Sequence, residues 1–157
     1  MLRTGWLYGP VGDNFCLKVL GWARQQEVLK IAADQTGSPT TTLWLAEVVC
    51  ALIAAMQKLT GSEIANRGGL YHACCHGAVD RCSFAREIVA QAGTAGIALA
   101  CREIAAARTA DFPAAARRPA YSALESEKLE AVWGIAAPDW RDALGPVIAR
   151  LSPLLSG

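Results

Sequence analysis

Apolar and polar positions alternate in blocks along the first third of the chain, and the blocks have the lengths of strands and helices. Residues 2–7 have the composition of a strand and end at a Gly-Pro turn. From residue 13 to about residue 26, apolar side chains recur at the spacing of one buried helical stripe, with Asp13 placed as the N-cap. Residues 28–33 form a second run of strand length, and a polar turn then leads to a long helix from about 42 to 58. This order predicts β-α-β-α.

The rest of the chain continues the mixture of strands and helices with weaker signals. Residues 70–74 are typical of a strand, and residues 83–92 of a helix that glycines terminate. The run 97–107 is rich in alanine and is assigned as a weak strand. Ser126 and Asp139 are placed to cap two further helices. We therefore expect an α/β fold, with α+β as the alternative, built on a small partial sheet.

The most apolar stretch, residues 43–56, contains Glu47 as its one charged residue. A helix that spans a bilayer needs about 20 such residues, so this segment is shorter than a membrane span. The pattern predicts a buried helix with more apolar residues than one face can cover, part of which packs against another unit.

Composition narrows the classes of function. The chain has 157 residues, of which 53% are hydrophobic and 18% charged, so it is expected to be globular. Its net charge of +1 predicts neither a nucleic-acid partner nor binding to an anionic membrane. The mean hydropathy of +0.24 indicates apolar surface that another unit covers. The N-terminus shows no signal-peptide pattern, which favours the cytoplasm.

Cysteines and histidines cluster near the middle of the chain and raise the alternative of a zinc site. His72, Cys74, Cys75, His76 and Cys82 have the side chains that zinc prefers. Their spacing argues against a tetrahedral site, because adjacent cysteines on a strand point to opposite faces and no second Cys-x-x-Cys pair follows. We expect no metal, and reduced structural thiols at the six cysteines.

Short motifs in a fixed order carry a resemblance to a known family. They are Arg3-Thr4-Gly5-Trp6-Leu7-Tyr8-Gly9, Gly12-Asp13-Asn14-Phe15, Asp34-Gln35-Thr36-Gly37-Ser38-Pro39-Thr40, Gly69-Leu70-Tyr71-His72, Phe84-Ala85-Arg86-Glu87-Ile88, Arg118-Pro119-Ala120-Tyr121-Ser122 and Pro138-Asp139-Trp140-Arg141. In sequence and spacing this series resembles the C-terminal half of the dTDP-4-dehydrorhamnose reductases, which are extended short-chain dehydrogenases. The order is more specific than any one motif.

The resemblance implies an NADPH-dependent reduction of dTDP-4-dehydro-L-rhamnose to dTDP-L-rhamnose, a step in the synthesis of surface polysaccharide. In that family an N-terminal Rossmann domain holds the cofactor, and a Tyr-x-x-x-Lys pair supplies the proton. None of the three tyrosines here has a lysine four residues later, and the turn Gly93-Thr94-Ala95-Gly96 lacks a third glycine and follows a helix. We therefore expect residues 1–157 to form a single partial domain that is inactive alone, with no catalytic residue and no cofactor of its own.

The same resemblance assigns the candidate residues at the start of the chain. Trp6 is expected against the sugar, since an indole stacks on the apolar face of a hexose; a core tryptophan is the alternative. Thr4 and Gly5 are expected beside the nicotinamide of the cofactor. Asn14 opens the first helix, where the diphosphate of a nucleotide sugar could lie, with helix capping as the equal alternative.

The other candidates come from two polar segments. Gln35, Ser38 and Thr40 resemble the family's substrate-side loop, although such clusters are usually only turns. Arg118 resembles an arginine that holds the nucleotide, because a guanidinium binds phosphate in a bidentate manner. Its neighbour Arg117 is expected to be solvated.

The sequence leaves two hypotheses of function open. One is the substrate side of a reductase, whose partners are the nucleotide sugar and the missing Rossmann domain. The other is a non-catalytic protein that binds a nucleotide sugar or interacts with another chain. In either case an exposed strand edge and apolar helix favour self-association, so a homo-oligomer stays open too.

Overall fold

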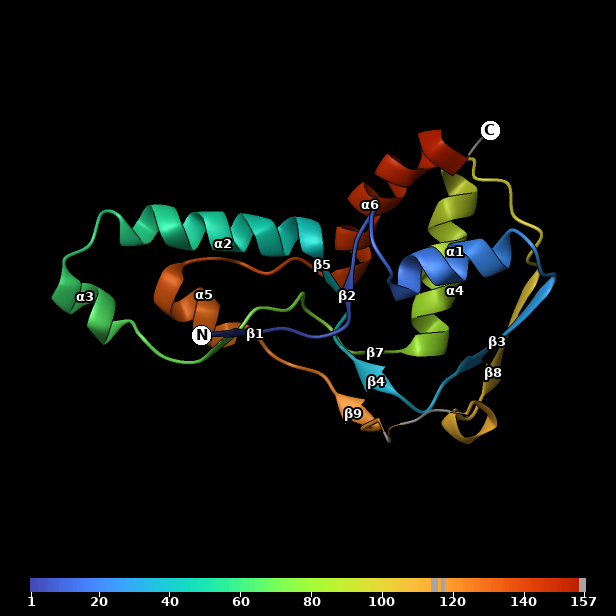
Figure 1. Cartoon of the computed structure of the whole chain (residues 1–157), viewed down its shortest axis with the longest axis horizontal. Helices are drawn as coiled ribbons and strands as arrows, with labels where there is room; N and C mark the ends of the chain where they lie inside the picture. The colour runs from blue at the N-terminus through green and yellow to red at the C-terminus, as the bar shows by residue number, and fades with distance from the viewer. Residues whose placement is uncertain (114–115, 117, 156–157) are drawn as a thin grey trace.

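The computed structural model describes residues 1–113, 116 and 118–155, and they form an elongated molecule with two lobes (Figure 1). The elements, in order, are β1 (Leu2–Arg3), β2 (Leu7–Tyr8), α1 (Phe15–Ala23), β3 (Val28–Ala32), β4 (Thr36–Gly37), β5 (Thr40–Thr41), α2 (Thr42–Met56), α3 (Gly61–Asn66), β6 (Tyr71–His72), β7 (Val79–Asp80), α4 (Arg81–Thr94), β8 (Glu103–Ala107), η1 (Thr109–Asp111), β9 (Tyr121–Ser122), α5 (Glu127–Trp133) and α6 (Trp140–Leu155). This mixture confirms the predicted α/β class.

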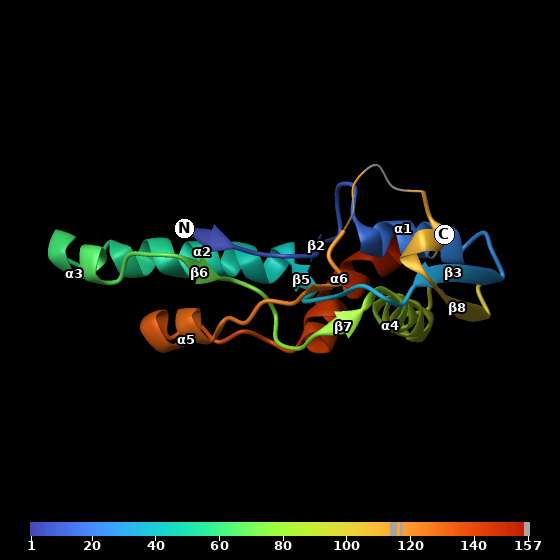
Figure 2. The same ribbon diagram turned by 90° about the horizontal axis from the view of Figure 1, so that it is seen from below.

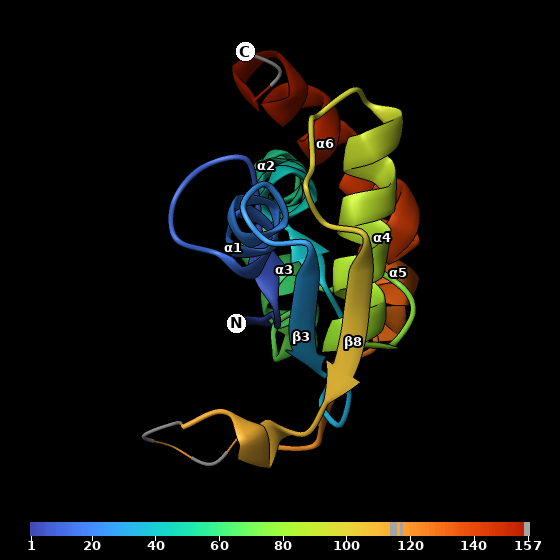
Figure 3. The ribbon, with the colours of Figure 1, turned by 90° about the vertical axis from the view of Figure 1, so that its right-hand side faces the viewer.

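Among the described residues the strands form four small sheets. The longest pair is parallel and joins β3 to β8, side by side in Figure 3, with Leu29 opposite Ile104. Leu29 and Ile31 are buried while Val28 and Lys30 are exposed, which is the alternation of a strand with one covered face. β1 pairs with β6 and β2 with β5, both in parallel, and β4 lies between β7 and β9. The partial sheet that the sequence predicts is thus divided into several pieces.

One lobe contains the main core, where α1, α4 and α6 pack around Phe84. The Phe84 ring is 1% exposed and meets the rings of Tyr8, Phe15 and Trp140 at centroid distances of 5.3, 5.9 and 5.6 Å. Aromatic pairs at such distances add stability beyond the burial of their area. This cluster anchors the start of α4 against β2 and α1, which fixes one side of the site described below.

The other lobe contains α2, α3, α5, β1 and β6. In Figure 2, α2, α3, β1 and β6 lie at one level and α5 lies below them. Thr41 caps α2 because its Oγ1 accepts from the Leu43 amide at 3.2 Å. Within α2 only Trp44 and Val48 are buried, whereas Val49, Ile53 and Met56 are 40%, 53% and 39% exposed. The expectation of a buried helix is therefore wrong for this face, which no described element covers. The exposed residues agree with the expected excess of apolar residues over one covered face.

The structure also corrects three details of the local predictions. Asn14, not Asp13, caps α1, and its Oδ1 accepts from the Leu17 amide. The strand expected at residues 2–7 is interrupted at Trp6, whose backbone leaves the extended region. Ser126 precedes α5 without capping it, because its hydroxyl is engaged elsewhere. Within the described segments, every helix is too short or too polar to cross a membrane.

Candidate functional site

A cavity of about 1260 Å³ opens between α1, the end of β3, the first turn of α4 and the segment after β8. Its walls combine aromatic, basic and small residues. They are Phe15, Trp22, Lys30, Ile31, Ala32, Asp34, Gln35, Arg81, Thr109, Ala110, Phe112, Ala116, Arg118, Pro119 and Ala120. Sites for small molecules usually enclose roughly 300–1,000 Å³. The cavity is therefore large enough for a ligand of several rings.

A chain of hydrogen bonds crosses one wall of the cavity. Arg81 Nε donates to Gln35 Oε1 at 2.8 Å, and Gln35 Nε2 donates to Thr109 Oγ1 at 2.9 Å. Thr109 Oγ1 then donates to Asp34 Oδ1 at 2.6 Å, and the Thr109 amide donates to the same carboxylate. The Thr109 hydroxyl bond lowers the pKa of Asp34 below its usual range. Gln35 is 7% exposed and uses both ends of its amide, so its position is fixed.

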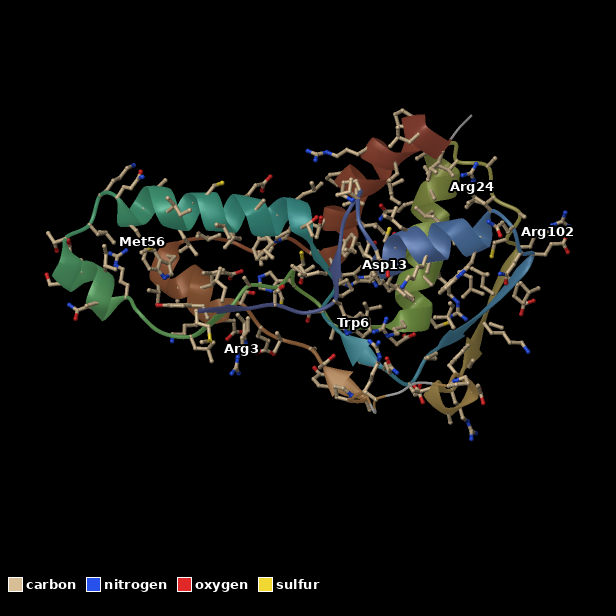
Figure 4. All side chains as sticks on the ribbon, in the orientation of Figure 1. Arg3, Trp6, Asp13, Arg24, Met56 and Arg102 are labelled. Carbon is tan, nitrogen blue, oxygen red and sulfur yellow. The ribbon has the colours of Figure 1, made fainter. Side chains whose placement is uncertain are left out.

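Trp6 lies near the middle of the molecule, where the two lobes meet (Figure 4). Its φ of 45° makes it the one non-glycine residue in the described segments with a left-handed backbone. Such a conformation is uncommon for a bulky residue and often marks a functional site. The Trp6 carbonyl accepts from the Thr40 amide at 3.2 Å, which holds the bend beside β5. The Arg81 guanidinium lies 4.5 Å from the centroid of the indole.

The predicted candidates are only partly brought together. Gln35 and Arg118 line the cavity. Trp6 does not line it; it packs against the core and contacts Arg81, which is part of the cavity wall. Asn14 Nδ2, in the side chain, donates to the backbone carbonyls of Gly9 and Val11, at 3.1 Å each, while Oδ1 of the same side chain caps α1. Its side chain thus has the structural role that the sequence left as an equal alternative.

Ser38 and Thr40 are buried and occupied with the backbone. Ser38 Oγ donates to the Leu124 carbonyl and accepts from the Leu124 amide, at 3.1 and 3.2 Å. Thr40 Oγ1 donates to the Ser38 carbonyl at 3.2 Å. Thr4 and Gly5 follow β1 outside the cavity, and Arg117 lies outside the described residues.

Sequence reasoning missed Arg81, Trp22, Asp34 and Thr109 as residues of the site. Arg81 shows no local signal beyond its place two residues before a predicted helix. Its contact with Gln35 spans 46 positions, and that of Gln35 with Thr109 spans 74. A single sequence provides no pattern for such long-range pairs.

The cysteines and histidines do not converge. His76 Nε2 lies 2.6 Å from Glu130 Oε1, and the six cysteines are unbridged. In the described part of the chain, no three metal-binding side chains form a group. Burial raises the pKa of Cys16 to about 12 and that of Cys75 to about 11, which keeps both thiols protonated.

Burial also raises the pKa of the Tyr8 phenol, whose hydroxyl lacks a hydrogen-bond partner among the described atoms. A raised pKa makes a phenol a weaker proton donor. A smaller cavity of about 390 Å³ lies between α4 and α6, and none of the predicted site residues lines it. The chemistry therefore centres on the larger cavity.

Known proteins resemble this chain both in sequence and in fold. Residues 1–152 match the family described as "RmlD substrate binding domain". The dTDP-4-dehydrorhamnose reductase of Burkholderia thailandensis is 37% identical over 152 residues, which are 95% of this chain and 50% of that protein. The Escherichia coli K12 protein of the same name is 34% identical over 90% of this chain and 46% of its own length. The chain thus spans about half the length of these relatives.

Solved structures of proteins with the same name resemble this chain in fold. A dTDP-4-dehydrorhamnose reductase from Clostridium acetobutylicum superposes with a TM-score of 0.80 at 31% identity, covering 96% of this chain and 48% of that one. The Bacillus anthracis structure of that name, in complex with NADP, superposes with a TM-score of 0.78 at 27% identity, covering 95% and 47%.

Proposed function

Because this chain belongs to the RmlD substrate-binding domain family, we propose that it is the nucleotide-sugar-binding half of a dTDP-4-dehydrorhamnose reductase. The complete enzyme reduces dTDP-4-dehydro-L-rhamnose to dTDP-L-rhamnose with NADPH. The proposal includes the site residues Trp6, Gln35 and Arg118, and places the reaction in the cytoplasm. We assign a structural role to Asn14, Ser38 and Thr40, because their side chains donate hydrogen bonds to backbone carbonyls near the site.

The cavity is the observation that carries this proposal. Trp22 and Phe112 line it and are 38% and 41% exposed, so they offer free aromatic surface to a base. Arg118 lines it too and suits a phosphate of the nucleotide. Trp6 contacts Arg81 and lies at the strained bend, which suits a sugar next to the diphosphate. Base, diphosphate and sugar thus each have a matching surface.

The reducing chemistry is supplied by the other half of the enzyme. Reduction of the C4 ketone needs a hydride at carbon and a proton at oxygen, and NADPH supplies the hydride. The sequence has no Tyr-x-x-x-Lys pair for the proton. The space directly beside Gly5 is open, because an added Cβ would meet only Leu124, at 4.0 Å. We therefore assign Thr4 and Gly5 to the edge of the nicotinamide site.

This chain has an exposed surface that the cofactor half is expected to cover. Among the described strands β1 pairs with β6 alone, so its other edge is open to a further strand. The same lobe exposes Val49, Ile53 and Met56 of α2. Large apolar side chains grouped on one helix mark an interaction surface. We assign this surface, defined by the β1 edge and these three residues, to the Rossmann half.

Complementation tests the function directly. The chain would be mixed with the separately produced cofactor half of the Burkholderia thailandensis relative, and NADPH oxidation followed with dTDP-4-dehydro-L-rhamnose. We expect turnover from the mixture and none from either half alone. Turnover by this chain alone, after removal of host reductase, or none from a mixture that forms a complex, would contradict the proposal.

A second candidate is a non-catalytic nucleotide-sugar-binding protein. One observation favours it: this chain supplies both aromatic and basic side chains to the cavity walls. A chain that binds dTDP-sugar tightly but gives no turnover with any cofactor half would support this candidate.

A further inference from the structure

Arg81 is held from three directions at the wall of the cavity. Its guanidinium carbon lies 4.5 Å from the ring centroid of Trp6 and 5.2 Å from that of Phe15. Its Nε donates to Gln35 Oε1, and its amide donates to the Gln35 carbonyl at 3.2 Å. A planar guanidinium stacks on aromatic faces in this way, which an ammonium does less well. The side chain is therefore fixed before any ligand arrives.

This fixed guanidinium still has unused donors. Its Nε is bonded to Gln35, but among residues 1–113, 116 and 118–155 no acceptor meets its two Nη groups. An arginine has five N–H donors in a planar fork, and the outer four suit the oxygens of a phosphate. Since Arg81 lines the cavity, these donors are available to a ligand there.

The charge around Arg81 is also unbalanced. Three basic residues line the cavity, Lys30, Arg81 and Arg118, and Asp34 is the one acidic residue among the described lining residues. Asp34 is engaged with Thr109, and neighbouring Asp80 accepts from the Ser83 amide at 2.9 Å. In the described segments, neither Arg81 nor Arg118 forms an ion pair with a carboxylate. Burial lowers the pKa of Arg81, and the positive charge of Arg118, which lines the same cavity, lowers it further.

We propose that Arg81 and Arg118 together form an anion site that binds the diphosphate of the ligand, with Trp6, Phe15 and Gln35 holding Arg81 in position. The proposal rests on the nucleotide-sugar function above and adds a residue to it. An anion between the two guanidiniums relieves their repulsion and fills the unused donors of Arg81. The contact with Trp6 then couples the diphosphate to the sugar side of the site.

Titration calorimetry of the full chain with inorganic pyrophosphate and with dTDP tests the site. We expect both to bind the wild type, and Arg81→Gln to weaken both by about tenfold or more, as loss of a charged hydrogen bond does. Arg118→Gln, on an exposed segment, should weaken both as well. The matched control is Arg24→Gln, which removes the same charge at the far end of α1 (Figure 4) and should change neither affinity.

Arg81→Lys keeps the charge and provides the test if Arg81→Gln does not fold. A lysine lacks the planar fork, so we expect it also to bind pyrophosphate more weakly than the wild type. Equal affinity of the wild type and both Arg81 variants would overturn the role of Arg81 and leave the nucleotide-sugar function standing. A wild type that does not bind pyrophosphate at millimolar concentration would overturn the anion site. Binding of pyrophosphate but not of dTDP would support the anion site and contradict the nucleotide-sugar function.

Discussion

The indole of Trp6 lies directly against the backbone of Gly37. A Cβ at position 37 would fall 2.3 Å from Cε2 and 2.6 Å from Nε1 of that ring. Gly37 is also the centre of the three-stranded sheet, where β4 meets both β7 and β9. The absence of a side chain at position 37 therefore allows the strained Trp6 to sit beside the sheet.

Gly37→Ala should displace Trp6 and destabilise the chain. A rigid ring cannot yield by such a distance, and overpacking of this kind costs about 1–3 kcal/mol. Denaturation in urea measures the loss, and the near-UV circular dichroism of tryptophan reports the displacement. Gly21→Ala is the control: nothing lies within 4 Å of an added Cβ, and a helical glycine replaced by alanine should stabilise by about 0.5–1 kcal/mol. Loss of stability in both variants to the same extent would contradict this account.

Ser126 joins two distant segments through one buried hydroxyl. Its Oγ accepts from the Cys74 amide and donates to the Cys74 carbonyl, both at 2.8 Å, and Ser126 is 1% exposed. Ser126→Ala leaves both backbone groups unpaired, which costs about 1–3 kcal/mol for each. Chemical denaturation should show this loss, whereas exposed Ser62→Ala should stay within about 0.5 kcal/mol of wild type. If the free energy of unfolding of Ser126→Ala equals that of the wild type, a water molecule bonds the Cys74 backbone in place of the hydroxyl.

Ile53→Asp on α2 should weaken both properties of the apolar surface, which are self-association and binding of the cofactor half. We expect the wild-type chain to self-associate at tens of micromolar and the variant to sediment as a monomer, because its exposed apolar surface is reduced. The variant should also bind the cofactor half at least about tenfold more weakly, since burial of an isoleucine contributes about 1.5–3 kcal/mol. Leu154→Asp, which is 75% exposed at the end of α6, is the control and should keep full complementation. Unchanged complementation by Ile53→Asp would place the docking surface elsewhere.

Glu130 should make stability depend on pH in the acidic range. The Ala137 amide donates to its carboxylate at 2.8 Å and, with His76, holds the pKa of Glu130 below its ordinary value of 4.5. Because folding lowers this pKa, ionised Glu130 stabilises the chain above about pH 4.5, and the contribution is lost as the pH falls through the folded-state pKa. The melting temperatures of the wild type and Glu130→Gln should therefore differ at pH 7 and converge as the pH falls below the folded-state pKa. Exposed Glu125→Gln should show no such convergence.

The sequence alone determined the family and the order of most elements. Residues 28–33 form an apolar run of strand length and residues 42–58 a longer one of helix length, and β3 and α2 follow them closely. Gln35 and Arg118 were found because they stand in motifs that resemble the family. Each of these signals is local, so a single chain is enough to carry it.

Tertiary structure decided how the polar residues are used. Ser38 and Thr40 looked like Gln35 in the sequence, yet the fold turns their hydroxyls to the backbone and leaves Gln35 in the cavity. Arg81 joins the site only because α4 packs against α1 and β2, far away in the sequence. For α2 the sequence predicted an apolar face that another unit covers, but apolar spacing shows only that a face needs cover and not which element supplies it. These outcomes depend on contacts between distant segments, and such contacts form only when the whole chain has folded.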